Sequence, residues 1–173
     1  NDGLVLPLPI STGTAVAWSR CDGAEVEAVA LDFGKERDRF IARKAAPHQP
    51  ADWRSYLRGM AQGIDAQGMK LALAGSNPRG AGLSSSASLC IALGRAMAAA
   101  GRVDLTQREL ALMAQMAEHR WAGVHCGIMD QMAIAAGEPG LVGAAALAAF
   151  GAGGHTTLAG AQAQFAQYDM IWH

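Results

Sequence analysis

The sequence is short of charge and of cysteine, and both shortages exclude classes of protein. Charged residues make up 17% of the 173 positions and the formal net charge is −1. This composition predicts neither a nucleic acid nor a membrane surface as a partner. Only three cysteines occur, Cys21, Cys90 and Cys126, and none forms a C-x-x-C pair. Their odd number argues against a disulfide framework and favours a reducing compartment, so we expect a cytoplasmic protein.

The chain also lacks the segments that target or anchor a protein. The alanine-rich stretch 141–151 is too short, and too interrupted by glycine, to span a bilayer. No basic segment is followed by an apolar one, as in a secretory signal. The chain opens at Asn1 rather than at methionine, so we expect that its true start is missing. The remaining composition, 51% hydrophobic, is that of one globular domain with a single core.

Apolar periodicity predicts a mixed α and β domain. Alternation or short apolar runs predict strands over residues 4–10, 14–19, 25–31 and 69–74. Helical spacing predicts helices over 53–64, with Asp52 as N-cap, and over 88–100, and a third that begins at Asp104 or Thr106. The turn residues 21–23 predict that strands 14–19 and 25–31 pair as a hairpin. Residues 33–46 are expected to be a charged surface connection, and residues 129–136 fit either a strand or a helix.

The stretch NPRGAGLSSSASLC, residues 77–90, places glycines and serines between a strand and a helix. Gly80 and Gly82 allow the backbone to approach a ligand closely, and the start of the following helix offers unpaired N–H groups with a partial positive charge. Such a place binds phosphate. The loop is neither a Walker A motif nor a dinucleotide G-x-G-x-x-G. A glycine turn with a serine N-cap is the structural alternative, and the three consecutive serines favour the phosphate site.

The stretch PRGAGLSSSAS resembles the phosphate-binding motif of the GHMP kinases, and its triple serine is nearest to the galactokinase branch of that family. Three further segments are similar to galactokinase patterns: AEHRWAGVHCGIMDQ at 117–131, NDGLVLP at 1–7 and WRSYLRG at 53–59. The resemblance covers roughly residues 1–140, in order. It implies an α+β fold, the GHMP-kinase N-terminal domain of the ribosomal protein S5 domain 2-like type, with a mixed sheet packed by helices.

The resemblance also implies an activity and a site. The activity is transfer of the γ-phosphoryl group of ATP to the anomeric hydroxyl of galactose, giving galactose 1-phosphate, so galactose and ATP are the expected small-molecule partners. Ser86 and Glu118 would hold Mg²⁺, a hard cation that suits a hydroxyl and a carboxylate. Asp130 would be the base or would orient the attacking hydroxyl. Gly127 and Asp130 would contact the sugar. The ATP-binding residues would be the adenine-facing Trp53 and the loop residues Gly80, Ala81, Gly82, Leu83, Ser84, Ser85 and Ser86.

Each of these residues also has a structural interpretation. Glu118 alone fits a solvated helix face, Asp130 fits an N-cap, and Trp53 fits a core position at helical spacing with Leu57. His119, His125 and Cys126 match no common zinc spacing, and we interpret them as structural.

The sequence departs from the family pattern at both ends. The family's catalytic arginine and E-H-x-D sugar ligands would lie upstream of Asn1. We expect residues 141–173 to be a divergent alanine- and glycine-rich tail in place of the L-I-D-C strand, and the C-terminal kinase domain to be absent. We therefore expect residues 1–140 to be the ATP- and sugar-binding domain, and little or no kinase activity from the chain in isolation. The alternatives are a non-catalytic galactose- and ATP-binding protein, an inactive gene fragment produced by frameshift or truncation, or another GHMP kinase.

Overall fold

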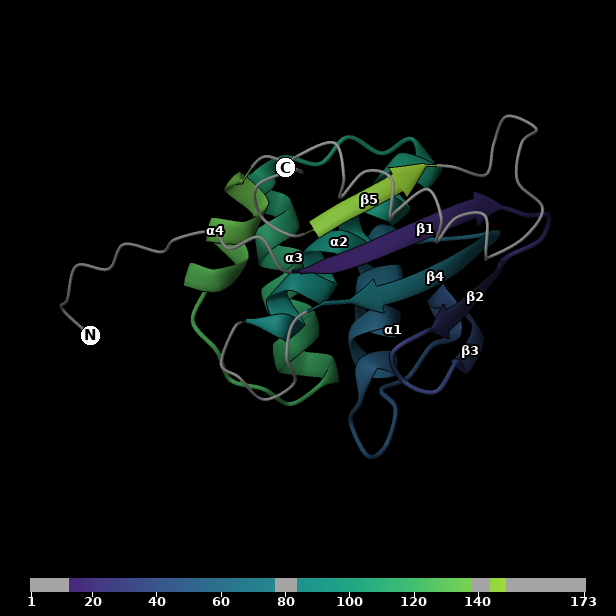
Figure 1. The fold of residues 1–173 in the computed structure, drawn as a ribbon, viewed down its shortest axis with the longest axis horizontal. Coiled ribbons are helices and arrows are strands. Elements are labelled where there is room, and N and C mark those ends of the chain that lie inside the picture. Colours follow the sequence, from purple (N-terminus) through teal and green to yellow (C-terminus); the bar gives the residue numbers. More distant parts are fainter. Residues whose placement is uncertain (1–12, 77–83, 138–143, 149–173) are drawn as a thin grey trace, which may run out of the picture.

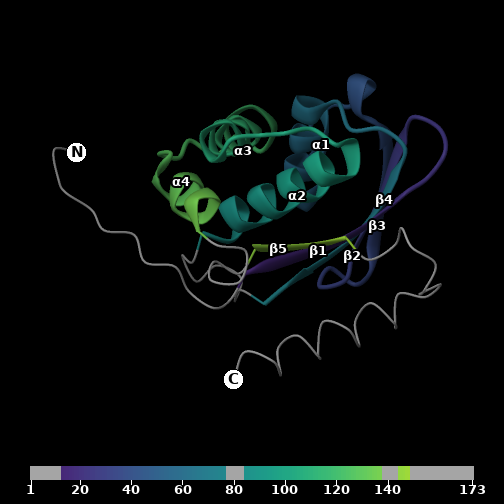
Figure 2. The ribbon, with the colours of Figure 1, turned by 90° about the horizontal axis from the view of Figure 1, so that it is seen from above.

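The computed structural model describes residues 13–76, 84–137 and 144–148. Along the chain they form β1 (Thr14–Arg20), β2 (Glu25–Ala30), β3 (Glu36–Ile41), the short 3₁₀ helix η1 (Ala42–Lys44), α1 (Trp53–Ile64), β4 (Met69–Gly75), α2 (Ser85–Gly101), α3 (Gln107–Trp121), α4 (Met129–Ala136) and β5 (Ala144–Ala148). The fold is α+β, as expected. Figures 1 and 2 show the four α-helices of the described chain gathered on one face of a twisted sheet.

The sheet is mixed, with strand order β3-β2-β4-β1-β5. β4 lies in the middle, antiparallel to β1 and parallel to β2, with Val16 opposite Leu73 and Val29 opposite Ala72. The predicted hairpin of the first two strands is therefore wrong. The reason is that the connection after β1 turns around the start of β4. The N–H of Cys21 donates to the carbonyl of Gly68 (2.8 Å), and Gly68, at φ 57°, has no room for a Cβ against the carbonyls of Cys21 and Gly23.

The segment predicted as an irregular surface connection contains a strand. β3 pairs antiparallel with β2, and Glu25 lies opposite Ile41. It is an edge strand of the sheet, and its four charged residues give no hydrophobic pattern by which to predict it. Asp38, the buried member, receives two hydrogen bonds of 2.8 Å from the guanidinium of Arg58 on α1. At the inward-facing position of β3 an ion pair between two largely buried side chains therefore stands where the inner strands have an apolar side chain.

The core lies between the sheet and the helices, and α2 runs through its centre. Every second residue of the inner strands points into it, as Val16, Val26 and Leu71 do, and Ile91 and Leu93 of α2 are fully buried. α2 has eleven buried residues because it is covered by the sheet on one side and by the other helices on the other. The buried helix predicted from its alanine-rich sequence is thus confirmed.

The helix ends follow local capping chemistry. Asp52 caps α1 by accepting from the N–H of Arg54 (2.9 Å), as predicted. α3 begins after Thr106, which forms a reciprocal capping box with Glu109, and this decides between the two predicted starts. α2 begins at Ser85, one turn earlier than the predicted 88, after Ser84 in the left-handed region at φ 52°. Residues 129–136 form a helix rather than a strand.

Some predictions lie outside the described residues: the strand 4–10, the resemblance over 1–7, and the loop residues Gly80, Ala81, Gly82 and Leu83. Within the predicted tail, the structure describes β5, which pairs in parallel with β1, Ala146 lying opposite Val16. The domain boundary at residue 140 stays a prediction. None of the helices in the described ranges is long and apolar enough to cross a membrane.

Candidate functional site

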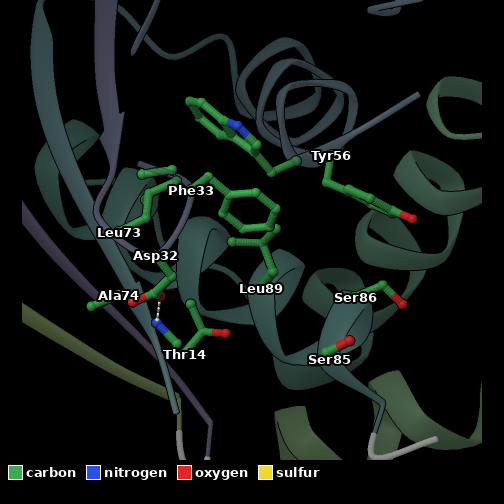
Figure 3. A pocket seen from close by; sticks show the side chains of 12 residues that line it. Thr14, Asp32, Phe33, Tyr56, Leu73, Ala74, Ser85, Ser86 and Leu89 are labelled. Atoms are coloured by element: carbon green, nitrogen blue, oxygen red, sulfur yellow. Dashed lines mark hydrogen bonds between the residues drawn. The ribbon is translucent and has the colours of Figure 1, made fainter. Parts of the chain in front are cut away.

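A cavity of about 210 Å³ opens beside the first turn of α2. Figure 3 shows the side chains of Phe33, Tyr56 and Leu89 along one part of it and the hydroxyls of Ser85 and Ser86 at another. Its wall is thus apolar and aromatic over most of its extent and hydroxylic at the helix start. The lining residues are Thr14, Ala30, Asp32, Phe33, Trp53, Tyr56, Leu73, Ala74, Gly75, Ser85, Ser86 and Leu89.

The hydroxylic end of the cavity is built by the N-terminus of a 17-residue helix. The first N–H groups of an α-helix have no acceptor within the helix, and the helix dipole adds a partial positive charge there. Ser85 is exposed and Ser86 is half-buried at this end. Ser88 has a different task, because its hydroxyl accepts from the N–H of Thr14 (3.0 Å) and ties α2 to β1. An anionic group and a flat apolar group could therefore bind side by side.

Trp53 is both a core residue and a wall of the cavity. Its side chain is 2% exposed, and its indole N–H donates to Glu36 (3.3 Å). The guanidinium of Arg54 lies 4.9 Å from the centre of its ring, and the ring of Phe33 lies at 6.4 Å between centroids. The indole is therefore held rigidly. Its two interpretations, core and cavity wall, are compatible.

Ser86 and Glu118, which are far apart in the sequence, meet in the fold. The hydroxyl of Ser86 on α2 donates to Oε2 of Glu118 on α3 (2.7 Å). Glu118 is 2% exposed, so it is not a solvated helix face residue. A buried carboxylate must be hydrogen-bonded or paired with a cation to be stable. Its hydrogen bond to Ser86 places a carboxylate directly behind a residue that lines the cavity.

A third helix completes the surroundings of that carboxylate. Gln131, in the first turns of α4 and 1% exposed, donates from Nε2 to Oε1 of Glu118 (2.6 Å). The same Nε2 lies 3.3 Å from Sγ of Cys126. Its Oε1 has no hydrogen-bond partner among the described residues. Sequence reasoning assigned no role to Gln131, although it closes the quoted C-G-I-M-D-Q pattern.

The loop between α3 and α4 is fixed by side chains of α3. Nε2 of His119 lies 2.8 Å from the carbonyl oxygen of Cys126 and 3.2 Å from its backbone nitrogen. Gln115 donates to the same carbonyl oxygen (3.2 Å). The loop holds Gly127, which is exposed, and leads to Asp130, which is half-buried in the first turn of α4. His119 and the backbone of Cys126 therefore shape the loop, in agreement with their structural interpretation.

The charge of Glu118 acts on its neighbours. Burial raises the pKa of Tyr56 above its ordinary value, and Glu118 raises it further. The pKa of the Cys126 thiol is raised by burial and then by Glu118, and burial raises that of Cys90 well above its ordinary range. These cysteines are therefore protonated at neutral pH, which makes them unsuited to be nucleophiles or thiolate ligands.

The donor set suits Mg²⁺. A hydroxyl and a carboxylate, both oxygens, meet at the helix start where phosphate oxygens would complete the coordination. Within the described ranges there is no group of three or more His, Cys, Asp or Glu side chains that could hold a metal without a ligand's help. Such a site would depend on the phosphates of the nucleotide, as Mg²⁺ sites of phosphoryl-transfer enzymes commonly do.

The structure unites some of the predicted residues and separates others. Trp53, Ser85 and Ser86 line the cavity, and Glu118 lies directly behind Ser86. Ser84 precedes the helix, while Gly127 and Asp130 belong to the neighbouring loop and helix and are not among the lining residues. The lining residues Phe33, Tyr56 and Leu89 were not predicted. The spacing of Tyr56 from Trp53 in the W-R-S-Y segment was the available signal for one of them.

Several solved structures with a similar fold are kinases. A galactokinase from Lactococcus lactis, solved in complex with galactose, is 27% identical with a TM-score of 0.68, and the match covers 75% of this chain and 35% of that one. A mevalonate kinase from Methanococcus jannaschii (19%, TM-score 0.59) and a D-glycero-D-manno-heptose 1-phosphate kinase from Bacteriodes thetaiotaomicron (17%, TM-score 0.57) each match 69% of this chain and 40% of their own. The chain thus spans well under half the length of each of these structures.

A family model gives the same result independently. Residues 53–138, from the start of α1 to the end of α4, match the model of the GHMP kinases N terminal domain. This range contains Trp53, the serines at the start of α2, Glu118 and Asp130. Because the arrangement of strands and helices agrees with the match, the described residues have the α+β fold of a GHMP kinase N-terminal domain.

Proposed function

We propose that this domain binds ATP with Mg²⁺ and serves transfer of the γ-phosphoryl group to the anomeric hydroxyl of galactose. Membership in the GHMP kinase fold implies a phosphotransferase acting on a small molecule. The choice of galactose is supported by the 27% identity to a galactokinase and by the C-G-I-M-D-Q segment. The mevalonate and heptose-phosphate kinases share the fold at lower identity.

The observation that carries the proposal is the contact between Ser86 and Glu118. Phosphoryl transfer needs positioning and charge neutralisation more than covalent help. A 2.7 Å hydrogen bond joins a hydroxyl at a helix start to a buried carboxylate from another helix, beside a cavity with aromatic walls. This arrangement supports a nucleotide whose base lies against Trp53 and Phe33 and whose phosphates lie at the start of α2.

Each residue then has a role that its surroundings support. Ser85 and Ser86, with the first N–H groups of α2, bind phosphate oxygens. Ser86 and Glu118 hold Mg²⁺, which when bound neutralises charge on the phosphates. Asp130 orients the sugar hydroxyl and takes its proton, and Gly127 allows close approach of the loop backbone to the sugar, since a Cβ there would meet nothing within 4 Å.

The proposal is tested with the purified 173-residue chain and a fluorescent ATP analogue, with and without Mg²⁺. We expect saturable binding that Mg²⁺ strengthens. In Glu118→Gln the Mg²⁺-dependent gain should fall by about tenfold or more, because the carboxylate charge at the metal is lost. The matched control is Glu109→Gln, the same change at the exposed start of the same helix, which should bind as the wild type does. Absence of nucleotide binding by the wild-type chain would overturn the proposal.

The substrate is tested by ADP release in the presence of galactose, mevalonate or D-glycero-D-manno-heptose 1-phosphate. We expect little or no turnover from the isolated chain, and any substrate-dependent release to require galactose. ADP release with mevalonate alone would show that mevalonate, and not galactose, is the substrate. Nucleotide binding without ADP release, whose affinity none of the three small molecules changes, would favour the second candidate function, a nucleotide-binding protein without turnover.

A further inference from the structure

We infer that Gln131 is a positioning residue for the cation: it holds the carboxylate of Glu118 so that Oε2 stays on the Ser86 side. This rests on the proposed metal role of Glu118. Three helices meet at that carboxylate, with Ser86 from α2 on one oxygen and Gln131 from α4 on the other. A glutamate side chain has three rotatable bonds, and holding both oxygens fixes the plane of the carboxylate.

The orientation of the Gln131 amide follows from its partner. An ionised carboxylate only accepts hydrogen bonds, so the atom 2.6 Å from Oε1 of Glu118 must be the donating Nε2. The amide oxygen is then left without a partner among the described residues, in a side chain that is 1% exposed. A buried, unpaired amide oxygen costs stability. The hydrogen bond from Nε2 to Glu118 is the favourable contact that accompanies this unpaired oxygen.

The division of the two oxygens explains why this contact bears on metal binding. Oε2 of Glu118 faces Ser86, the second proposed ligand, so it is the oxygen available to a cation. Once a cation shares Ser86 and Glu118, the Gln131 hydrogen bond to Oε1 still restrains the carboxylate. Loss of a group that orients a metal ligand in this way typically lowers metal affinity by roughly ten- to a hundredfold.

A purely structural role for Gln131 makes a different prediction. Its Nε2 also lies 3.3 Å from Sγ of Cys126 and could simply support the α3–α4 loop. Gln115 supports the same residue, donating to the carbonyl oxygen of Cys126 from α3. Replacing Gln115 by methionine therefore removes loop support without removing the bond to Glu118, and it is the matched control.

The experiment measures binding of Mn²⁺, as a spin-active stand-in for Mg²⁺, by paramagnetic resonance of the free ion, with the full chain and a non-hydrolysable ATP analogue. Gln131→Met keeps the volume and removes only the Nε2 hydrogen bonds, because Oε1 has no partner among the described residues. We expect Mn²⁺ affinity to fall about ten- to a hundredfold in Gln131→Met and to stay within about twofold of wild type in Gln115→Met.

A double-mutant cycle with Glu118→Gln separates action through Glu118 from other effects. If Gln131 acts through Glu118, Gln131→Met causes no further loss of Mn²⁺ affinity when Glu118 is already glutamine. Should the methionine variant not fold, Gln131→Asn keeps the amide but is one methylene too short to reach Glu118, and the same loss is expected.

The outcomes are distinguishable. Wild-type Mn²⁺ binding that Gln131→Met leaves unchanged, or equal losses in Gln131→Met and Gln115→Met, would overturn the inference and leave the proposed function standing. Nucleotide binding without any Mn²⁺ binding by the wild type would overturn the metal role of Glu118, and the inference with it. A wild type that binds neither would overturn the proposed function as a whole.

Discussion

Two glutamates of α3 show how position decides what a carboxylate does. Glu109, in the first turn, is exposed and accepts from the N–H (2.9 Å) and the hydroxyl (2.6 Å) of Thr106. Glu118, near the other end, is buried and accepts from side chains of two other helices. The first stabilises the helix that carries it, and the second joins that helix to α2 and α4. The same residue type on one helix therefore caps the helix at one end and links three helices at the other.

Glu109 makes the stability of the domain depend on pH. The hydrogen bonds from Thr106 hold the pKa of Glu109 below its ordinary value of 4.5. Its contribution is therefore complete above the unfolded-state pKa and is lost as the pH falls through the lower folded-state pKa. In Glu109→Gln the capping box can still form but does not titrate. We expect urea unfolding between about pH 7 and about pH 3 to show a smaller loss of stability in the variant than in the wild type.

The quantity to compare is the loss of unfolding free energy between the two pH values in each protein, since the other carboxylates are the same in both. Identical pH profiles for the wild type and Glu109→Gln would contradict the role assigned to the capping box.

At this scale the sequence predicted the site only in part. Ser86 and Glu118 could be paired in advance because their two motifs resemble a family pattern, and nothing in their spacing indicates contact. Gln131 and Phe33 could not be predicted, because a glutamine after an aspartate, or a phenylalanine after a strand, has no local signature. Gln131 contacts Glu118 of α3, and Phe33 lines the cavity, only because the fold brings distant elements together.

Among the elements, α1 shows most directly how close packing limits the choice of residue. Gly59 is buried, and a Cβ there would lie 2.8 Å from Cγ of Trp121 and 3.0 Å from Cβ of Ala117, both on α3. Gly63, one turn later, is exposed, and a Cβ there would meet only the terminal methyl of Met113 at 3.0 Å. One glycine allows α1 and α3 to approach, and the other has no such task.

These two glycines give a matched pair of substitutions. Gly63→Ala should raise the free energy of unfolding by about 0.5–1 kcal/mol, because alanine favours the helix and the Met113 methyl can move aside. Gly59→Ala gains the same helix preference but forces apart a rigid ring and a Cβ, at about 1–3 kcal/mol. We expect Gly59→Ala to be less stable than wild type and Gly63→Ala more stable. Denaturant unfolding of both variants checks this, and stabilisation by Gly59→Ala would contradict the close approach.

The elements also show where prediction from sequence succeeds. α1 was predicted with its cap because Asp52 and the spacing of Trp53, Leu57 and Met60 are local signals. β3 was missed because its buried position holds Asp38, whose partner Arg58 lies on another element. The predicted hairpin of β1 and β2 was wrong because turn residues indicate that a chain reverses direction, but do not indicate which strand it then pairs with. β4, which comes later in the sequence, lies between β1 and β2 and pairs with both.

On the scale of the whole molecule, an ion pair joins the edge of the sheet to the helical layer. Arg58 of α1 makes a two-pronged contact with Asp38 of β3, and its Nη1 donates to the carbonyl of Ala46 (3.1 Å). The side chain of Asp38 is 6% exposed and that of Arg58 is 20% exposed. The hydrogen bond to Asp38 raises the pKa of Arg58, so the guanidinium stays charged throughout the ordinary pH range.

Breaking this pair should weaken the whole domain. Asp38→Asn leaves the guanidinium of Arg58 without a compensating charge, and we expect a loss of about 2–3 kcal/mol in the free energy of unfolding. Glu25→Gln is the control. It removes one of the two carboxylate partners of Arg39, where the side chains of Glu25 and Arg39 are both exposed, and it should have little effect. Equal effects of the two substitutions on urea unfolding would contradict the special position of Asp38.

The central place of β4 also orders events during synthesis. β2 and β3 can pair as soon as residue 41 is available, because Glu25 and Ile41 are neighbours across one short turn. Of the described strands β1 is made first, yet its antiparallel partner ends at Gly75, opposite Thr14. A ribosome working from the N-terminus therefore releases an apolar strand that waits for β4, and closing so long a loop costs more entropy than closing a hairpin. While that wait lasts, the edge of β1 is open to chaperones and to other nascent chains.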